Sequence, residues 1–80
     1  MTNIQTITET QNILEAQIKR LQNILWENKE IRHDEIAKNA GFVDTDEYRI
    51  LLEAAINLKS QINAYTDALY TLGDLKSTLS

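Results

Sequence analysis

The stretch that decides the fold is YRILLEAAINLKSQINAYTDALYTL, residues 48–72. Its apolar side chains recur at alternating spacings of three and four residues, the heptad pattern of an amphipathic helix that packs along a partner. Lys76 takes the next position of the pattern, and Leu79 follows it. The members of this seam within the stretch are Tyr48, Leu51, Ala55, Leu58, Ile62, Tyr65, Leu69 and Leu72.

A similar seam occupies the first third of the chain, with Gln11 as its one polar member. Isolated amphipathic helices are marginal in water, so two such helices each need a partner. The chain of 80 residues contains no proline and no cysteine, so neither a helix breaker nor a disulfide opposes a helical fold. The apolar members of this first seam are Ile4, Ile7, Leu14, Ile18, Leu21 and Leu25.

The two seams predict the all-α class and one domain, residues 1–80, built as an elongated antiparallel helical hairpin. A lone hairpin would leave apolar surface uncovered, and a small chain gains stability by association. We therefore expect a homo-oligomeric helical bundle, with a dimer as the simplest form. The residues assigned to the oligomer seam are Leu14, Ile18, Leu21, Leu25, Leu51, Leu58, Ile62, Tyr65, Leu69 and Leu72.

The bend of the hairpin is expected after the first seam ends, because Asn28 and Arg32 occupy the next two core positions. This places a helix at about 4–31, a short helix at about 34–40 and a long helix at about 45–77. Gly41 would close the short helix in the left-handed conformation. Since no proline enforces a break, a continuous bent first helix is the alternative.

Both long helices carry sequence signals for their starts. The first begins either at Thr2, with Gln5 three residues later, or at Thr6, with Glu9 three residues later. For the long helix, Asp44 is the expected N-cap with Glu47 as its capping-box partner. Val43 would then pack on Tyr48 as a hydrophobic staple.

The net charge of −4 is concentrated at the bend, because residues 34–53 contain six acidic and two basic residues. Acidic residues at helix starts also oppose the helix dipoles, which is a purely structural explanation. As a functional surface, the cluster would bind a basic region of a macromolecular partner. We predict partner contacts at Asp34, Glu35, Asp44, Asp46, Glu47, Arg49 and Glu53, with Trp26 as either a partner anchor or a core residue packed on Phe42.

No residue pattern points to catalysis. With a single histidine and no cysteine, a nucleophile and base cannot be paired within the chain, and no glycine-rich phosphate loop is present. Glu30 and His33 have the Glu-x-x-His spacing of di-iron bundles, but they lie beyond the last apolar core residue of their helix. We predict no enzyme activity, no cofactor and no metal.

The N-terminal region lacks the basic flank and apolar run of a signal peptide, and no segment approaches a membrane span. The lack of cysteine is compatible with a reducing compartment. We expect no membrane association and a location in the cytoplasm of the cell or of an infected host.

Two segments resemble known families. Residues 35–44, EIAKNAGFVD, with Tyr48 following, resemble the helix-turn-helix of AraC-type transcription regulators. The resemblance covers about fifteen residues and implies a DNA-binding regulator in which Lys38, Asn39 and Arg49 approach DNA. However, the helix that would read DNA opens with Asp44, Asp46 and Glu47, which repel phosphates, so nucleic-acid binding is not favoured.

The overall order of elements is loosely similar to the coiled-coil tail-fibre assembly chaperones of T-even-like bacteriophages. The similarity is carried by residues 35–37, EIA, by Gly41 and by residues 52–58, LEAAINL, with one gap. It implies a small oligomeric assembly helper from a phage-like source. The leading hypothesis from the residues is a non-enzymatic interaction or inhibitor module of phage or mobile-element origin, whose protein partner is unknown.

Overall fold

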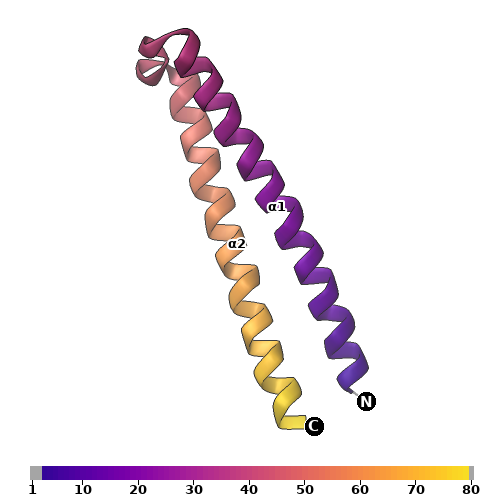
Figure 1. Cartoon of the computed structure of the whole chain (residues 1–80). Helices are drawn as coiled ribbons and strands as arrows, with labels where there is room; N and C mark the ends of the chain where they lie inside the picture. Colours follow the sequence, from indigo (N-terminus) through magenta and orange to yellow (C-terminus); the bar gives the residue numbers. More distant parts are fainter. Residues whose placement is uncertain (1–2, 80) are drawn as a thin grey trace.

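The computed structural model describes residues 3–79 as two long helices joined by one turn of 3-10 helix. Helix α1 spans Ile4–Lys38, η1 spans Ala40–Asp44 and α2 spans Asp46–Leu79. Figure 1 shows α1 and α2 side by side and antiparallel, with η1 at one end and both termini at the other. The predicted all-α helical hairpin is confirmed.

The hairpin is a thin rod. Its extents are 57 × 16 × 14 Å, and its radius of gyration is 17.8 Å, against about 12 Å for a compact domain of this length. A rod one helix pair thick has almost no interior. Among residues 3–79 the buried apolar side chains are Ile7, Leu21 and Ala55.

The contact between the helices follows the predicted seams. Ile7, Leu21 and Asn28 are the buried residues of α1, and they lie at multiples of seven residues from one another. Ala55 is the buried residue of α2. The seam positions at the open end of the rod, Ile4 and Leu79, are exposed. Most of the others are half-buried, because each helix has a single neighbour and the opposite sides of the stripe face solvent: Leu14, Ile18, Leu25, Leu51, Leu58, Ile62, Tyr65, Leu69 and Leu72.

The first helix does not end near residue 31, and the separate short helix expected at 34–40 is wrong. Instead α1 continues to Lys38, so the alternative of a continuous helix holds. The polar residues that interrupt the seam are accommodated inside the helix pair. Asn28 is buried and hydrogen-bonded, and Arg32 is half-buried beside it.

The helix ends also differ from the predicted caps. At α1 the cap is Asn3, whose side chain accepts a 2.9 Å hydrogen bond from the Thr6 backbone N–H; Thr2, one of the two predicted caps, lies outside the described residues. Gly41 does not have a positive φ. It lies in η1, with its N–H 3.0 Å from Oδ1 of Asn39.

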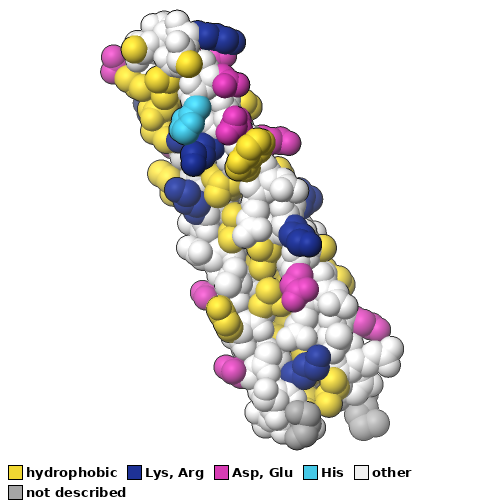
Figure 2. Space-filling model, viewed as in Figure 1, with side chains coloured by type: hydrophobic (Ala, Val, Ile, Leu, Met, Phe, Trp, Pro, Cys, Tyr) yellow, Lys and Arg dark blue, Asp and Glu magenta, His cyan; other side chains and the backbone are white. Residues whose placement is uncertain are grey.

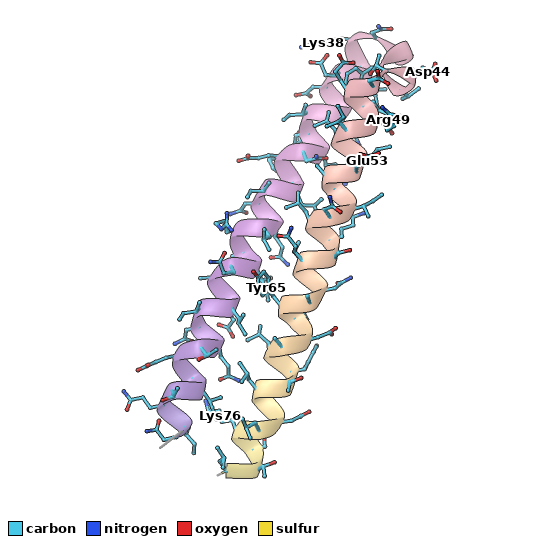
Figure 3. The ribbon with its side chains drawn as sticks, turned by 180° about the vertical axis from the view of Figure 1, so that it is seen from behind. Lys38, Asp44, Arg49, Glu53, Tyr65 and Lys76 are labelled. Atoms are coloured by element: carbon cyan, nitrogen blue, oxygen red, sulfur yellow. The ribbon has the colours of Figure 1, made fainter. Side chains whose placement is uncertain are left out.

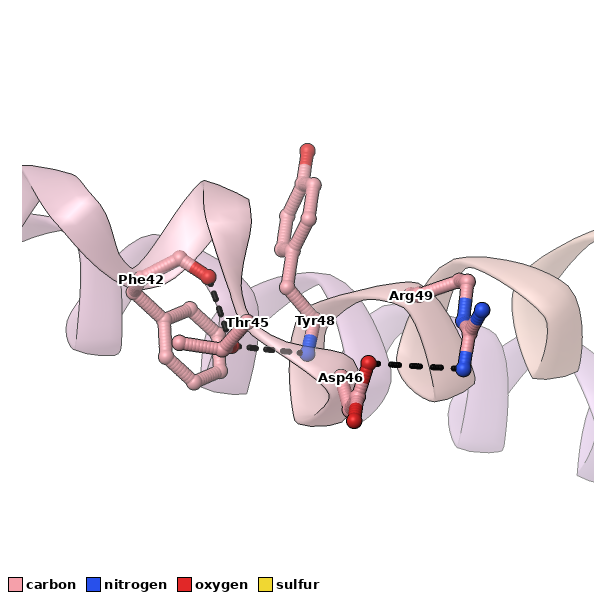
Figure 4. A network of polar contacts seen from close by, with 5 residues as sticks. All are labelled: Phe42, Thr45, Asp46, Tyr48 and Arg49. Atoms are coloured by element: carbon pink, nitrogen blue, oxygen red, sulfur yellow. Dashed lines mark hydrogen bonds and ion pairs between the residues drawn. The ribbon is translucent and has the colours of Figure 1, made fainter.

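The N-cap of α2 is Thr45 rather than Asp44. The Thr45 hydroxyl accepts a hydrogen bond from the Tyr48 N–H at 3.2 Å and donates one to the Phe42 carbonyl at 2.7 Å. Phe42 takes the place predicted for Val43 beside Tyr48, with ring centroids 5.8 Å apart in an edge-to-face arrangement (Figure 4). Val43 is exposed.

Candidate functional site

Two charged regions occupy neighbouring parts of the rod. One is the tip, defined here as residues 34–53, where α1 ends and α2 begins. The other is a groove between the helices, lined by Gln22, Leu25, Trp26, Lys29, Arg32, His33 and Lys59. The sequence predicted the tip as a partner surface, whereas the groove appears only once the helices are paired.

The tip is built by short-range hydrogen bonds. Asn39 closes α1 by donating its N–H to the Glu35 carbonyl, and its own carbonyl accepts the Phe42 N–H at 2.9 Å. Thr45 then connects Phe42 to Tyr48, as Figure 4 shows. The tip is therefore a defined corner rather than a loose loop.

The predicted acidic residues gather at this corner, and Figure 3 shows Asp44, Arg49 and Glu53 near the same end of the rod as Lys38. Two of the carboxylates have basic neighbours one turn away. Glu35 lies 3.8 Å from Lys38, and Asp46 lies 3.4 Å from Arg49. In the part of the chain that the structure describes, these are the ion pairs within 4.0 Å, so the remaining acidic residues of the tip keep uncompensated charge: Asp34, Asp44, Glu47 and Glu53.

Trp26 does not belong to the tip. Its side chain is 63% exposed and lines the groove. The predicted core of Trp26 and Phe42 is wrong, because Phe42 packs on Tyr48 instead. Trp26 is therefore separated from the acidic residues with which the sequence grouped it and is placed beside basic ones.

A buried polar network lies behind the groove. Asn28 is 7% exposed, and its Nδ2 donates a 2.9 Å hydrogen bond to the Leu51 carbonyl of α2. Its Oδ1 accepts a 2.8 Å hydrogen bond from Nε of Arg32. A buried amide is costly unless it is hydrogen-bonded, and here both of its polar ends are satisfied. The network thus connects the two helices and fixes the base of the Arg32 guanidinium.

The groove has a volume of about 480 Å³. Four of its lining side chains are Lys29, Arg32, His33 and Lys59, the last from α2 and the others from α1. Figure 2 shows the histidine with Lys or Arg side chains beside it, and a hydrophobic side chain and acidic side chains close to them. Neither ion pair of residues 3–79 involves a side chain of the groove.

The arrangement limits the chemistry that either region can perform. Within residues 3–79, no three His, Cys, Asp or Glu side chains come together as a metal-binding group. Along the described length of α1 and α2, no stretch is apolar and long enough to cross a bilayer. Both regions carry charged side chains on the surface of the rod.

No protein-family model, curated protein or solved structure matches this chain.

Sequence reasoning missed the groove for an identifiable reason. The basic residues of α1 in the groove alternate with Glu27 and Glu30, so the net charge of this segment is close to zero and the sequence shows no basic cluster. Helical spacing was the available signal, because residues three and four apart lie on one side of a helix. That spacing puts Lys29, Arg32 and His33 beside Trp26, but it does not reveal that Lys59 faces them from α2.

Proposed function

We propose that this chain is a non-enzymatic protein-binding module, a helical hairpin that self-associates along one face and binds a macromolecular partner through its acidic tip. The observation that carries the proposal is that the rod buries few of its apolar side chains. Eleven large apolar residues are exposed among those described. The accessible surface is 5946 Å², against about 4900 Å² for a compact monomer of this mass. The difference is comparable to the roughly 800 Å² that each partner buries in a standard interface.

Helical geometry supports one face of the rod as the self-association face. Leu58 and Lys59 lie on opposite sides of the buried Ala55, because successive residues of a helix turn by about 100°. Lys59 lines the groove, so Leu58 and the half-buried residues at seven-residue spacing from it face the other way: Leu51, Tyr65 and Leu72.

The same geometry applies to α1. Leu21 and Asn28 are buried against α2, and Leu25 lies on the groove side of them. Ile24 and Ile31 lie on the other side of α1, away from the groove. Both isoleucines are exposed. The proposed self-association face therefore combines Ile24 and Ile31 of α1 with Leu51, Leu58, Tyr65 and Leu72 of α2, and it leaves the groove and the tip free in a dimer.

Charge supports a protein with a basic surface as the partner of the tip. The carboxylates of Asp44, Glu47 and Glu53 are exposed and lack ion pairs among the described residues. Such a surface repels nucleic-acid phosphates and attracts lysine and arginine side chains. A helix-turn-helix also requires helices that cross at about 90–120°, whereas α1 and α2 run antiparallel (Figure 1). An inhibitor that occupies a basic cleft of another protein is one form of this function.

Self-association is tested by replacing Ile31 with lysine and measuring molar mass by light scattering over a dilution series. Ile31→Lys should shift the wild-type oligomer to monomer at a given concentration, because an unpaired charge would be buried at the proposed face. Ile56→Lys is the matched control, since Ile56 is 62% exposed and lies on the groove side of Ala55. Wild-type protein that remains monomeric at high concentration would contradict the proposal.

Partner binding is tested by charge neutralisation. The triple variant Asp44→Asn, Glu47→Gln, Glu53→Gln removes three exposed tip carboxylates, and Glu15→Gln, Asp67→Asn, Asp74→Asn removes three exposed carboxylates elsewhere. Affinity capture followed by mass spectrometry should recover a partner with wild type and with the second variant, but not with the first. Equal recovery by both variants would exclude the tip as the binding surface.

A further inference from the structure

We infer that the groove of Trp26, Lys29, Arg32, His33 and Lys59 is a binding site for a phosphate-bearing ligand of mononucleotide size, with Arg32 holding the phosphate and the Trp26 indole supporting the ring. This inference does not depend on the function proposed for the tip, because the two regions use different residues. It rests on the orientation of Arg32, on the unpaired charge of the groove and on the position of Trp26.

Arg32 is held in place from behind. Its Nε donates to Oδ1 of Asn28, and the Asn28 amide is in turn fixed by the Leu51 carbonyl on the other helix. This leaves the two terminal nitrogens of the guanidinium for a ligand. A planar fork of two N–H donors matches two oxygens of a phosphate or carboxylate. Because the side chain is already ordered, binding costs less conformational entropy than it would for a free arginine.

The cations of the groove form no ion pair among the described residues. Lys29, Arg32 and Lys59 line it, and no carboxylate among residues 3–79 lies within ion-pair distance of them. Like charges gathered on one surface repel one another, and an anion placed between them removes that repulsion. Three permanent cations exceed what a single carboxylate would need, so the doubly charged phosphate group is the better match.

The size and lining of the groove limit the remainder of the ligand. Its volume of about 480 Å³ falls in the range of about 300–1000 Å³ for small-molecule sites. Exposed Trp26, with Leu25 next to it, offers an aromatic and apolar platform beside the cations. A planar ring stacks on such a platform. An extended polynucleotide is disfavoured, because the acidic tip begins at residue 34, directly after His33 of the groove, and would repel its phosphates.

Trp26 supplies the reporter for the test, because it is the single tryptophan of the chain. We would titrate the full chain at low salt with AMP, with adenosine and with inorganic phosphate, following tryptophan fluorescence excited at the red edge and checking heats of binding by calorimetry. AMP should give a saturable change. Adenosine and inorganic phosphate should each bind about tenfold more weakly, because each lacks one of the two contacts.

Variants separate the site from general charge attraction. Arg32→Gln should weaken AMP binding about tenfold or more, whereas Arg49→Gln, which removes an equal charge from the exposed tip, should leave it within about twofold. Asn28→Leu keeps every groove cation but releases Arg32, and it should weaken AMP binding several-fold in protein that circular dichroism shows to be folded. A merely structural role for Asn28 would not produce that loss.

Three results would overturn the inference. The first is the absence of a saturable change with wild type at millimolar AMP. The second is an equal loss of affinity in Arg32→Gln and Arg49→Gln, which would mean unspecific attraction. The third is a short single-stranded oligonucleotide that binds more than about tenfold tighter than AMP, which would replace the mononucleotide by nucleic acid as the ligand.

Discussion

The tip and the groove are both charged, but they are constructed differently. The tip is made of neighbours in sequence, because its hydrogen bonds and ion pairs join residues two to four positions apart. The groove depends on contacts between helices. Its central arginine is positioned by Asn28, whose amide is bonded to a residue 23 positions away on α2. The groove therefore depends on helix pairing, whereas the hydrogen bonds of the tip lie within one stretch of sequence.

The difference also explains how an acidic chain presents a basic site. The overall charge of −4 lies in the tip segment, where the sequence is visibly acidic. The groove takes Lys29, Arg32 and His33 from one helix and Lys59 from the other. Net charge therefore describes the whole rod poorly, and each region must be tested separately.

The largest effect is expected from Leu21→Ala. Leu21 is 4% exposed at the contact between the helices, and removing a buried leucine side chain should lower the free energy of unfolding by about 2–5 kcal/mol. Urea unfolding followed by circular dichroism at fixed protein concentration measures this. Ile56→Ala, at an exposed site, should change stability by no more than about 0.5 kcal/mol. Equal effects of the two substitutions would mean that Leu21 does not hold the helices together.

Asn28→Leu should separate stability from binding. An asparagine at a seam position costs stability while fixing the register, and its carbonyl partner Leu51 keeps its own helical hydrogen bond. We expect the free energy of unfolding to rise by about 1 kcal/mol, while the groove loses affinity for AMP. Asn23→Leu, at an exposed position of α1, is the control. A marked loss of stability in Asn28→Leu would show that the network is needed for folding.

Thr45→Ala should act on the tip and leave the groove intact. It removes the N-cap of α2, whose loss costs about 1 kcal/mol, and with it the two hydroxyl hydrogen bonds to Phe42 and Tyr48. Hydrogen exchange should accelerate at the amides of residues 46–48. Thr71→Ala removes a hydroxyl that bonds to the Asp67 carbonyl within α2, and it should be neutral or slightly stabilising. Faster exchange throughout both helices of Thr45→Ala would mean that the tip is not an independent unit.

The smallest effect is expected from Arg49→Gln. The ion pair with Asp46 is 3.4 Å long, and both side chains are largely exposed, so its removal should cost no more than about 0.5 kcal/mol. Thermal unfolding at low and high salt measures this, because an exposed pair is screened by salt. A loss that persists in high salt would indicate that Arg49 contributes through packing rather than charge.

Much of the fold could be predicted because heptad spacing is a long, regular signal. The seams predicted both helices, and because the chain has no proline, a continuous first helix remained an alternative. The predicted break failed at Asn28 and Arg32, since spacing alone does not show that polar side chains can satisfy each other inside a helix pair. The N-cap was misassigned to Asp44 because Thr45, one residue later, is also a favoured cap residue.

The acidic tip could be predicted because its residues are close together in sequence. Asp44, Asp46 and Glu47 lie within four residues of sequence, at the end of η1 and the start of α2, so they stay close together at the corner of the rod. Trp26 was misplaced because a tryptophan next to a seam is usually a core residue. Its true neighbours depend on how α2 lies against α1, which the sequence of α1 does not contain.

The difference between the two regions is tested most directly by chemical-shift mapping of the isotopically labelled protein during titration with AMP. The largest shifts should fall in residues 22–33, at the Trp26 indole and around Lys59, which form the groove. The amides of residues 39–49 should stay in place, because the tip repels phosphate and is held by its own hydrogen bonds. Shifts that are largest at the tip, or that spread evenly along both helices, would contradict the assignment of the groove as the anion site.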